Sequence, residues 1–208
     1  MRKAGLFALM LTLLLTACGG EGERDPAAAL QEQYAAVAEA EMEAEITCHY
    51  GGEVRSYTME CGYTPEKSRV TVLAPQELAG ISAEVEKGEL LLSYEDISLD
   101  AGTYSGAALS PVTVLPELME AAAAGYVTEM SREPRQERDC LRMSCGLDRS
   151  ASTVYTTWFD EETLLPMYSE VVMEGTLVYQ TEWSRFQVTE RVQDAGETEM
   201  NEDQPAVG

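Results

Sequence analysis

Alternation of apolar and polar residues is the feature of this 208-residue sequence that most restricts its fold. Apolar residues recur at every second position through most of the stretch from Ile46 to Leu99, and again from Cys140 to Val188. A period of two places alternate side chains on opposite faces of an extended strand, so both stretches predict β-structure with one buried face. Turn residues such as Gly51-Gly52 and Lys87-Gly88 divide them at the spacing of an antiparallel meander.

These turns predict five strands in the first stretch and four in the second. The strands are expected at 46–50, 57–63, 70–73, 81–85, 89–94, 140–147, 153–159, 167–173 and 176–188. A hairpin turn at Glu174-Gly175 joins the last two.

A helix is predicted ahead of the first strand, over residues 27–44. Asp25 supplies an N-cap and Pro26 suits the first turn. Leu30 and Tyr34 are four residues apart and form part of a modest apolar stripe that can pack on a larger surface.

A second helix is predicted between the two groups of strands. Leu115-Pro116 is typical of a helix entry, helix formers run from Glu117 to Ala124, and Gly125 suits the C-terminal cap. Pro111 cannot lie deep in the same helix, so a short turn is expected before it. The order is therefore helix, five strands, helix, four strands, which predicts an α+β fold: one curved antiparallel sheet with the helices on one face or at its mouth.

The N-terminus has the pattern of an export signal. Arg2 and Lys3 precede an uncharged apolar run that ends in Leu-Thr-Ala before Cys18 and Gly19, which resembles the bacterial lipobox. The resemblance implies cleavage before Cys18 and acylation of its thiol, and hence a lipid anchor on the cell membrane. The alternative is an ordinary secretory signal with a chance cysteine.

Four segments follow from these features. We expect a signal peptide over 1–17, a lipidated tether over 18–25, one domain over 26–192 and an acidic disordered tail over 193–208.

The net charge limits the partners. The formal charge is −23, and loss of Arg2 and Lys3 with the signal brings it to −25. Such a surface repels nucleic acid and anionic headgroups, so no nucleic-acid role is expected and membrane contact is assigned to the lipid anchor.

Four cysteines remain in the exported chain: Cys48, Cys61, Cys140 and Cys145. Disulfides are possible outside the cytoplasm. On one regular strand, Cys140 and Cys145 would lie on opposite faces and about 16 Å apart at ~3.3 Å per residue, which favours long-range bonds to the other two. Four reduced thiols are the alternative.

Catalytic residues are scarce. The one histidine, His49, neighbours Cys48 on a strand, so the two side chains point to opposite faces. The sequence has no cluster at metal-ligand spacing, no phosphate-binding glycine loop and no nucleophile elbow. We predict neither an enzyme nor a cofactor, since a hydrolase would need convergent polar residues in a cleft.

A family resemblance enters through the segment from Trp158-Phe159-Asp160 to Pro166-Met167. This segment, the hairpin that follows, and Trp183 to Phe186 are similar to the LolA/LolB-like lipoprotein-carrier superfamily. The resemblance implies an incomplete, unclosed antiparallel β-barrel of about nine strands over 26–192, with two helices covering the open side. By itself, the stretch from Asp160 to Pro166 is interpreted as a structural turn.

The resemblance also implies that the inner face of the sheet binds acyl chains or another apolar ligand. The side chains assigned to this cavity are Tyr57, Met59, Val72, Val85, Leu92, Met143, Trp158 and Tyr179. The leading hypothesis is a monomeric, membrane-anchored, non-catalytic carrier. The alternative is an anchored sensor or scaffold that holds another envelope protein at a sheet edge or on its acidic surface.

Overall fold

A single antiparallel sheet dominates the computed structural model, which describes residues 25–103, 110–150 and 152–190. The strands of its N-terminal meander are β1 (Val37–Tyr50), β2 (Glu53–Tyr63), β3 (Lys67–Ala74), β4 (Ser82–Glu86), β5 (Glu89–Tyr94) and β6 (Ile97–Thr103). Those of its C-terminal meander are β7 (Tyr126–Arg135), β8 (Arg138–Gly146), β9 (Thr153–Asp160), β10 (Pro166–Met173) and β11 (Thr176–Glu190).

The two meanders join in the middle of the sheet. The strand order is β6-β5-β4-β3-β2-β1-β11-β10-β9-β8-β7, so the first strand pairs with the last and the sheet ends at two edges, β6 and β7. In this central pair, Met42 of β1 lies opposite Phe186 of β11. The unclosed antiparallel α+β fold is confirmed, and the described residues form eleven strands where about nine were predicted.

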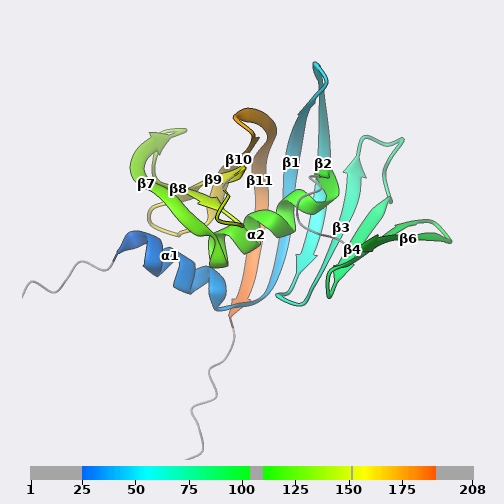
Figure 1. Ribbon diagram of the computed structural model, residues 1–208, viewed down its shortest axis with the longest axis horizontal. Helices are drawn as coiled ribbons and strands as arrows, with labels where there is room; N and C mark the ends of the chain where they lie inside the picture. The colour runs from blue at the N-terminus through cyan, green and yellow to red at the C-terminus, as the bar shows by residue number, and fades with distance from the viewer. Residues whose placement is uncertain (1–24, 104–109, 151, 191–208) are drawn as a thin grey trace, which may run out of the picture.

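Helices α1 (Pro26–Ala35) and α2 (Val114–Ala124) lie over one side of the sheet, with the short 3₁₀ turn η1 (Pro111–Thr113) leading into α2 (Figure 1). The Asp25 side chain accepts a hydrogen bond from the Ala27 amide at 3.0 Å, which confirms the predicted cap. Gly125 ends α2 as predicted.

The end of α2 is seated tightly against the sheet. A Cβ atom at Gly125 would lie 2.5 Å from the Ala121 carbonyl oxygen and 2.7 Å from the Cys145 Cβ. Glycine is therefore required by close approach of the helix end to β8, at an ordinary negative φ of −65°.

The core lies between the helices and the face of the sheet that carries Met42, Met59 and Met143, which we call the inner face. Leu30 of α1 and Leu115 of α2 are fully buried against it. Full burial of such a side chain contributes about 1.5–3 kcal/mol. The interior is thus filled by side chains of the chain itself.

The first helix is shorter than predicted. It stops at Ala35, and the rest of the predicted range 27–44 belongs to β1. Alanine and glutamate favour helices, but Glu39, Glu41, Glu43 and Glu45 alternate with residues that bury on the inner face. Tertiary burial with a period of two outweighs local helix propensity here.

Neither edge strand, β6 or β7, was predicted from the sequence. β6 has no buried residue, and β7 is polar along much of its length. An edge strand with little burial on either face has a weak alternating pattern, which explains why only the inner strands were recognised.

The turn between β9 and β10 has the structural role predicted for it. The Asp160 carboxylate accepts hydrogen bonds from the Thr163 amide at 2.9 Å and the Glu162 amide at 3.2 Å. Arg138 donates a further bond to it at 2.9 Å. These contacts, the Thr163 bonds first, lower the pKa of Asp160 below its usual value.

The segments predicted at the chain ends lie outside the described residues, namely the signal peptide, the Cys18 anchor with most of its tether, and the acidic tail. Within the described ranges, no helix is both long enough and apolar enough to cross a membrane.

Candidate functional site

The eight predicted cavity residues do not line one cavity. Met59, Val72, Met143 and Tyr179 are buried in the core, and Tyr57 packs against it. Leu92 is partly buried on β5. Only Val85 among the eight borders the groove beside α2 that is described below.

Trp158 lies on the opposite face of the sheet, so its assignment to an inner cavity was wrong. It packs with Cys140 and Tyr168 in a separate outer cluster. The period of two explains this, because the inner-face residue Phe159 is its direct neighbour on β9. The Arg135 guanidinium covers this cluster, 4.9 Å from the Trp158 ring centroid and 3.5 Å from that of Tyr168.

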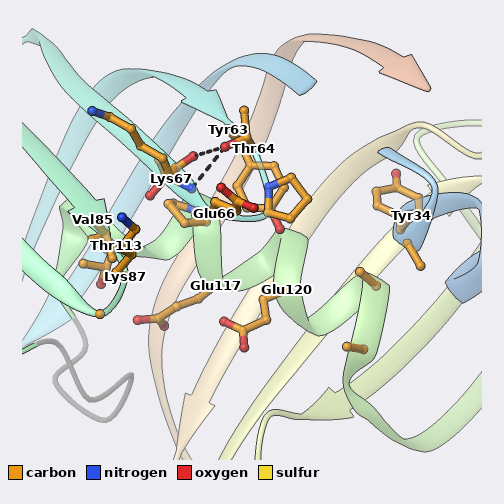
Figure 2. A pocket seen from close by; sticks show the side chains of 17 residues that line it. Tyr34, Tyr63, Thr64, Glu66, Lys67, Val85, Lys87, Thr113, Glu117 and Glu120 are labelled. Atoms are coloured by element: carbon orange, nitrogen blue, oxygen red, sulfur yellow. Dashed lines mark hydrogen bonds between the residues drawn. The ribbon is translucent and has the colours of Figure 1, made fainter. Parts of the chain in front are cut away.

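A groove of about 750 Å³, which we call the α2 groove, opens to solvent beside α2 (Figure 2). Its walls come from α2, the end of α1, the turn between β2 and β3, and the turn between β4 and β5. The lining residues are Tyr34, Ala35, Tyr63, Thr64, Pro65, Glu66, Lys67, Ser68, Val85, Lys87, Gly88, Thr113, Pro116, Glu117, Glu120, Ala123 and Ala124.

Charged and apolar residues occupy different parts of this groove. Figure 2 shows Lys67, Lys87 and Val85 gathered at one end and Tyr34 at the other, with Glu117 and Glu120 between them. A ligand with an apolar body and a polar end would find both kinds of surface along its length.

The turn between β2 and β3 is a well-bonded wall of the groove. The Thr64 amide donates to the Lys67 carbonyl at 2.7 Å, and the Thr64 hydroxyl donates to the same oxygen at 3.0 Å. Beyond the turn, the Lys67 ammonium lies 2.7 Å from Glu84 and 3.3 Å from Glu86. These carboxylates, Glu84 first, raise the pKa of Lys67.

Glu117 brings a buried carboxylate to the floor of the groove. Its residue is only 2% exposed, and it accepts a hydrogen bond from the Tyr155 hydroxyl at 2.8 Å. A buried polar group needs such a partner because its desolvation is costly. Glu117 therefore ties α2 to β9 at the boundary between core and groove.

Tyr34 closes the far end of the groove and fixes α1. Its hydroxyl donates to the Leu164 carbonyl at 2.9 Å, and its ring meets Phe159 edge-on at 5.2 Å. Burial raises the pKa of Tyr34 well above its usual value. Gln31 also donates to the Gly125 carbonyl at 2.7 Å, so the two helices are held together.

Several solved structures are similar to this chain. One is a domain of an outer membrane lipoprotein-sorting protein from Vibrio parahaemolyticus, with 10% identity and a TM-score of 0.44 over 83% of this chain and 93% of that one. A LolA superfamily protein from Nitrosomonas europaea has 12% identity and a TM-score of 0.43, covering 80% and 94%. The lipoprotein LppX from Mycobacterium tuberculosis has 13% identity and a TM-score of 0.43, covering 78% and 96%.

The likeness is one of fold. At these identities, and at TM-scores below 0.5, it says nothing about the family, ligand or partner of this chain. No protein-family model matches the sequence, and no curated protein does so.

A second hollow of about 400 Å³ lies beside the β1–β2 hairpin, at the central strands of the sheet. Tyr57 and Tyr179, two of the predicted cavity residues, border it together with Cys48 and Arg55. Burial raises the pKa of the Cys48 thiol, which disfavours the thiolate needed for nucleophilic chemistry. His49 turns the other way and hydrogen-bonds Gln180 at 2.8 Å, so these two residues do not act as a pair.

The four cysteines are free thiols in this structure. Cys140 and Cys145 share β8 and lie on opposite faces, as predicted, one in the outer cluster and one in the core. Burial raises the pKa of Cys61 to about 12 and that of Cys145 to about 11. The long-range disulfides favoured from the sequence are not formed here, and their formation in an oxidising compartment stays a prediction. In the described ranges, no cluster of three or more His, Cys, Asp or Glu is arranged to hold a metal ion.

The sequence reasoning missed the groove because turns from distant parts of the chain build it. Lys67 follows the β2–β3 turn, Lys87 lies in the β4–β5 turn, and neither belongs to a binding motif. Glu117 and Glu120 did contain a signal, since a spacing of three places two carboxylates on one side of an otherwise apolar helix.

Proposed function

We propose that this chain is a non-catalytic binding protein, exported and held on the membrane through a lipid on Cys18, that takes an acyl chain or similar apolar ligand in the groove beside α2. The groove's volume of about 750 Å³ carries the proposal, because it lies within the ~300–1,000 Å³ usual for small-molecule sites. The groove replaces the sheet interior as the site, since side chains fill that interior.

The groove's chemistry favours an amphiphile over a sugar or a nucleotide. Tyr63, Val85 and Pro116 offer apolar contact, while Lys67 and Lys87 at one end suit an anionic head. A carboxylate or phosphate head placed there would compete with Glu84 and Glu86 for the ammonium groups.

The test uses the mature chain with Cys18→Ser, so that no anchor lipid interferes. Native mass spectrometry before and after organic extraction would detect a co-purified lipid, and calorimetric titration with palmitic acid would then measure rebinding. We expect a lipid-sized mass that disappears on extraction, together with saturable binding of palmitic acid.

Two matched tryptophan substitutions locate the site. Ala124→Trp places a large ring in the groove from an exposed position. The control, Ala28→Trp, places the same ring outside the groove, at an exposed position of α1. We expect palmitic acid to bind Ala124→Trp at least tenfold more weakly and Ala28→Trp unchanged. Absence of binding by the parent, or equal binding by both variants, would refute the groove as the site.

A further inference from the structure

The edge of the sheet at β6 exposes a continuation of the core. One cross-strand row runs from the central strand outward through Met42, Cys61, Val70, Ala83, Leu92 and Leu99. Directly opposite residues share a face of the sheet, so all six belong to the inner face. The first four are buried, but Leu99 is 61% exposed.

Leu99 is not alone at this edge. Ile97, two residues before it on β6, is 71% exposed, and its partner Tyr94 on β5 is 44% exposed. Exposed single apolar residues are common, but three adjacent ones that extend the core form a patch. We call Tyr94, Ile97 and Leu99 the edge patch.

In the part of the chain that the structure describes, no strand pairs with the outer side of β6. Among the described residues, 25–103, 110–150 and 152–190, β5 is its only strand partner, so alternate residues turn N–H and C=O groups toward an edge that no described strand pairs with. At the C-terminal end of β6, the Asp100 carboxylate accepts a hydrogen bond from the Gly102 amide at 2.9 Å, and a bulge interrupts the pairing with β5. The half from Ile97 to Leu99 lacks such shielding.

The opposite edge shows how this chain protects a strand. β7 carries Pro134, which has no N–H to offer, and the charged residues Glu129, Arg132 and Glu133. Arg132 forms an ion pair with Glu161 at 2.7 Å. Charges and proline are common means of blocking edge pairing, and the exposed half of β6 has neither.

The surroundings of the edge patch are acidic. Glu89, Glu95, Asp96 and Asp100 lie on or between β5 and β6, and no lysine or arginine occurs from residue 88 to residue 131. These acids repel anionic membrane headgroups and favour a basic partner.

We propose that β6 is a docking edge for another protein, and that the docked segment is an extended strand in which apolar side chains alternate with lysine or arginine. Its backbone adds to β6 as a further strand, its apolar side chains cover the edge patch, and its basic side chains meet the acidic residues. This site is separate from the groove proposed to take a lipid.

The test titrates the mature Cys18→Ser chain with a fluorescent, end-blocked peptide of four alternating lysine–valine pairs, followed by anisotropy. The same peptide with glutamate in place of lysine tests the charge requirement. We expect saturable binding of the lysine peptide, weakened by added salt, and at least tenfold weaker binding of the glutamate peptide.

Two double variants with equal charge change locate the site. Ile97→Lys/Leu99→Lys alters the edge patch, while Tyr50→Lys/Val54→Lys alters equally exposed apolar residues at the β1–β2 hairpin. We expect Ile97→Lys/Leu99→Lys to weaken peptide binding at least tenfold. The hairpin variant should bind the peptide with an affinity within twofold of the parent, and so should Ala124→Trp, which alters the groove.

Hydrogen exchange supplies a readout that does not depend on the variants. Peptide binding should slow amide exchange in residues 97–103. Protection confined to other strands, equal weakening by both double variants, or binding of the parent to phosphatidylglycerol vesicles but not to the peptide would overturn the proposal.

Discussion

The two ends of the sheet use their apolar side chains in different ways. Around β8 and β9 both faces are covered, because Phe159 packs on α1 inside while Trp158 packs beneath Arg135 outside. Around β5 and β6, none of residues 89–103 is buried. One continuous sheet therefore combines a closed end, where side chains stabilise the fold, with an open end whose apolar groups are free to meet another molecule.

The largest expected contrast comes from truncating one apolar side chain at each end. Met143→Ala removes a core side chain from β8, so it should lower the free energy of unfolding by about 2–5 kcal/mol. Leu99→Ala, at the open end, should change it by less than about 0.5 kcal/mol. Urea denaturation measures both values, and equal losses would show that the ends do not differ.

A smaller contrast is expected from removing one hydroxyl group. Tyr155→Phe takes a hydrogen bond from the buried Glu117 carboxylate and should cost about 1–3 kcal/mol. Tyr94→Phe removes a hydroxyl at the exposed β5 position and should cost almost nothing. The same denaturation experiment measures this pair, and a neutral Tyr155→Phe would mean that Glu117 is satisfied without it.

The cation above the outer cluster should contribute less to the free energy of unfolding than the Tyr155–Glu117 hydrogen bond. Arg135→Met keeps an apolar stem but removes the charge from above Trp158 and Tyr168, which should cost about 0.5–2 kcal/mol. Lys87→Met, an exposed cation near the open end, should be neutral within about 0.5 kcal/mol. Thermal unfolding followed by tryptophan fluorescence separates the two outcomes.

The smallest expected effect is a pH dependence located at the closed end. The folded-state pKa of Asp160 is lowered, so its contribution to stability is present above the unfolded value of about 3.9 and is lost as pH falls through the folded value. Asp160→Asn and Thr163→Ala should both flatten the fall in unfolding free energy between about pH 5 and pH 2. An unchanged slope in both variants would exclude this carboxylate as the source.

Local chemistry explains which parts of the fold were predictable from sequence. The Asp25 cap, the Gly125 helix end and the alternating inner strands each depend on a few neighbouring residues, and the structure confirms them. The start of β1 was assigned to a helix because its alanines and glutamates favour one locally, whereas burial between β2 and β11 decides the outcome.

The candidate site was less predictable for a different reason. Apolarity identified Met59 and Met143 as inward-facing, but it does not distinguish a side chain that fills a core from one that lines a cavity. The groove depends on the distance of α2 from the β2–β3 and β4–β5 turns. The edge patch depends on β6 being the edge strand of the sheet. Both are properties of the assembled sheet.

Pairing of the first strand with the last has a consequence for how the chain acquires its shape. Val37 lies opposite Glu190, so the centre of the sheet joins residues from the two extremes of the domain. Contacts of such long sequence separation form late and slowly. Under the proposed export, with the N-terminus crossing the membrane first, β1 would lack its partner β11 until translocation of the domain is nearly complete, and a chaperone that shields β1 would have its greatest effect during that interval.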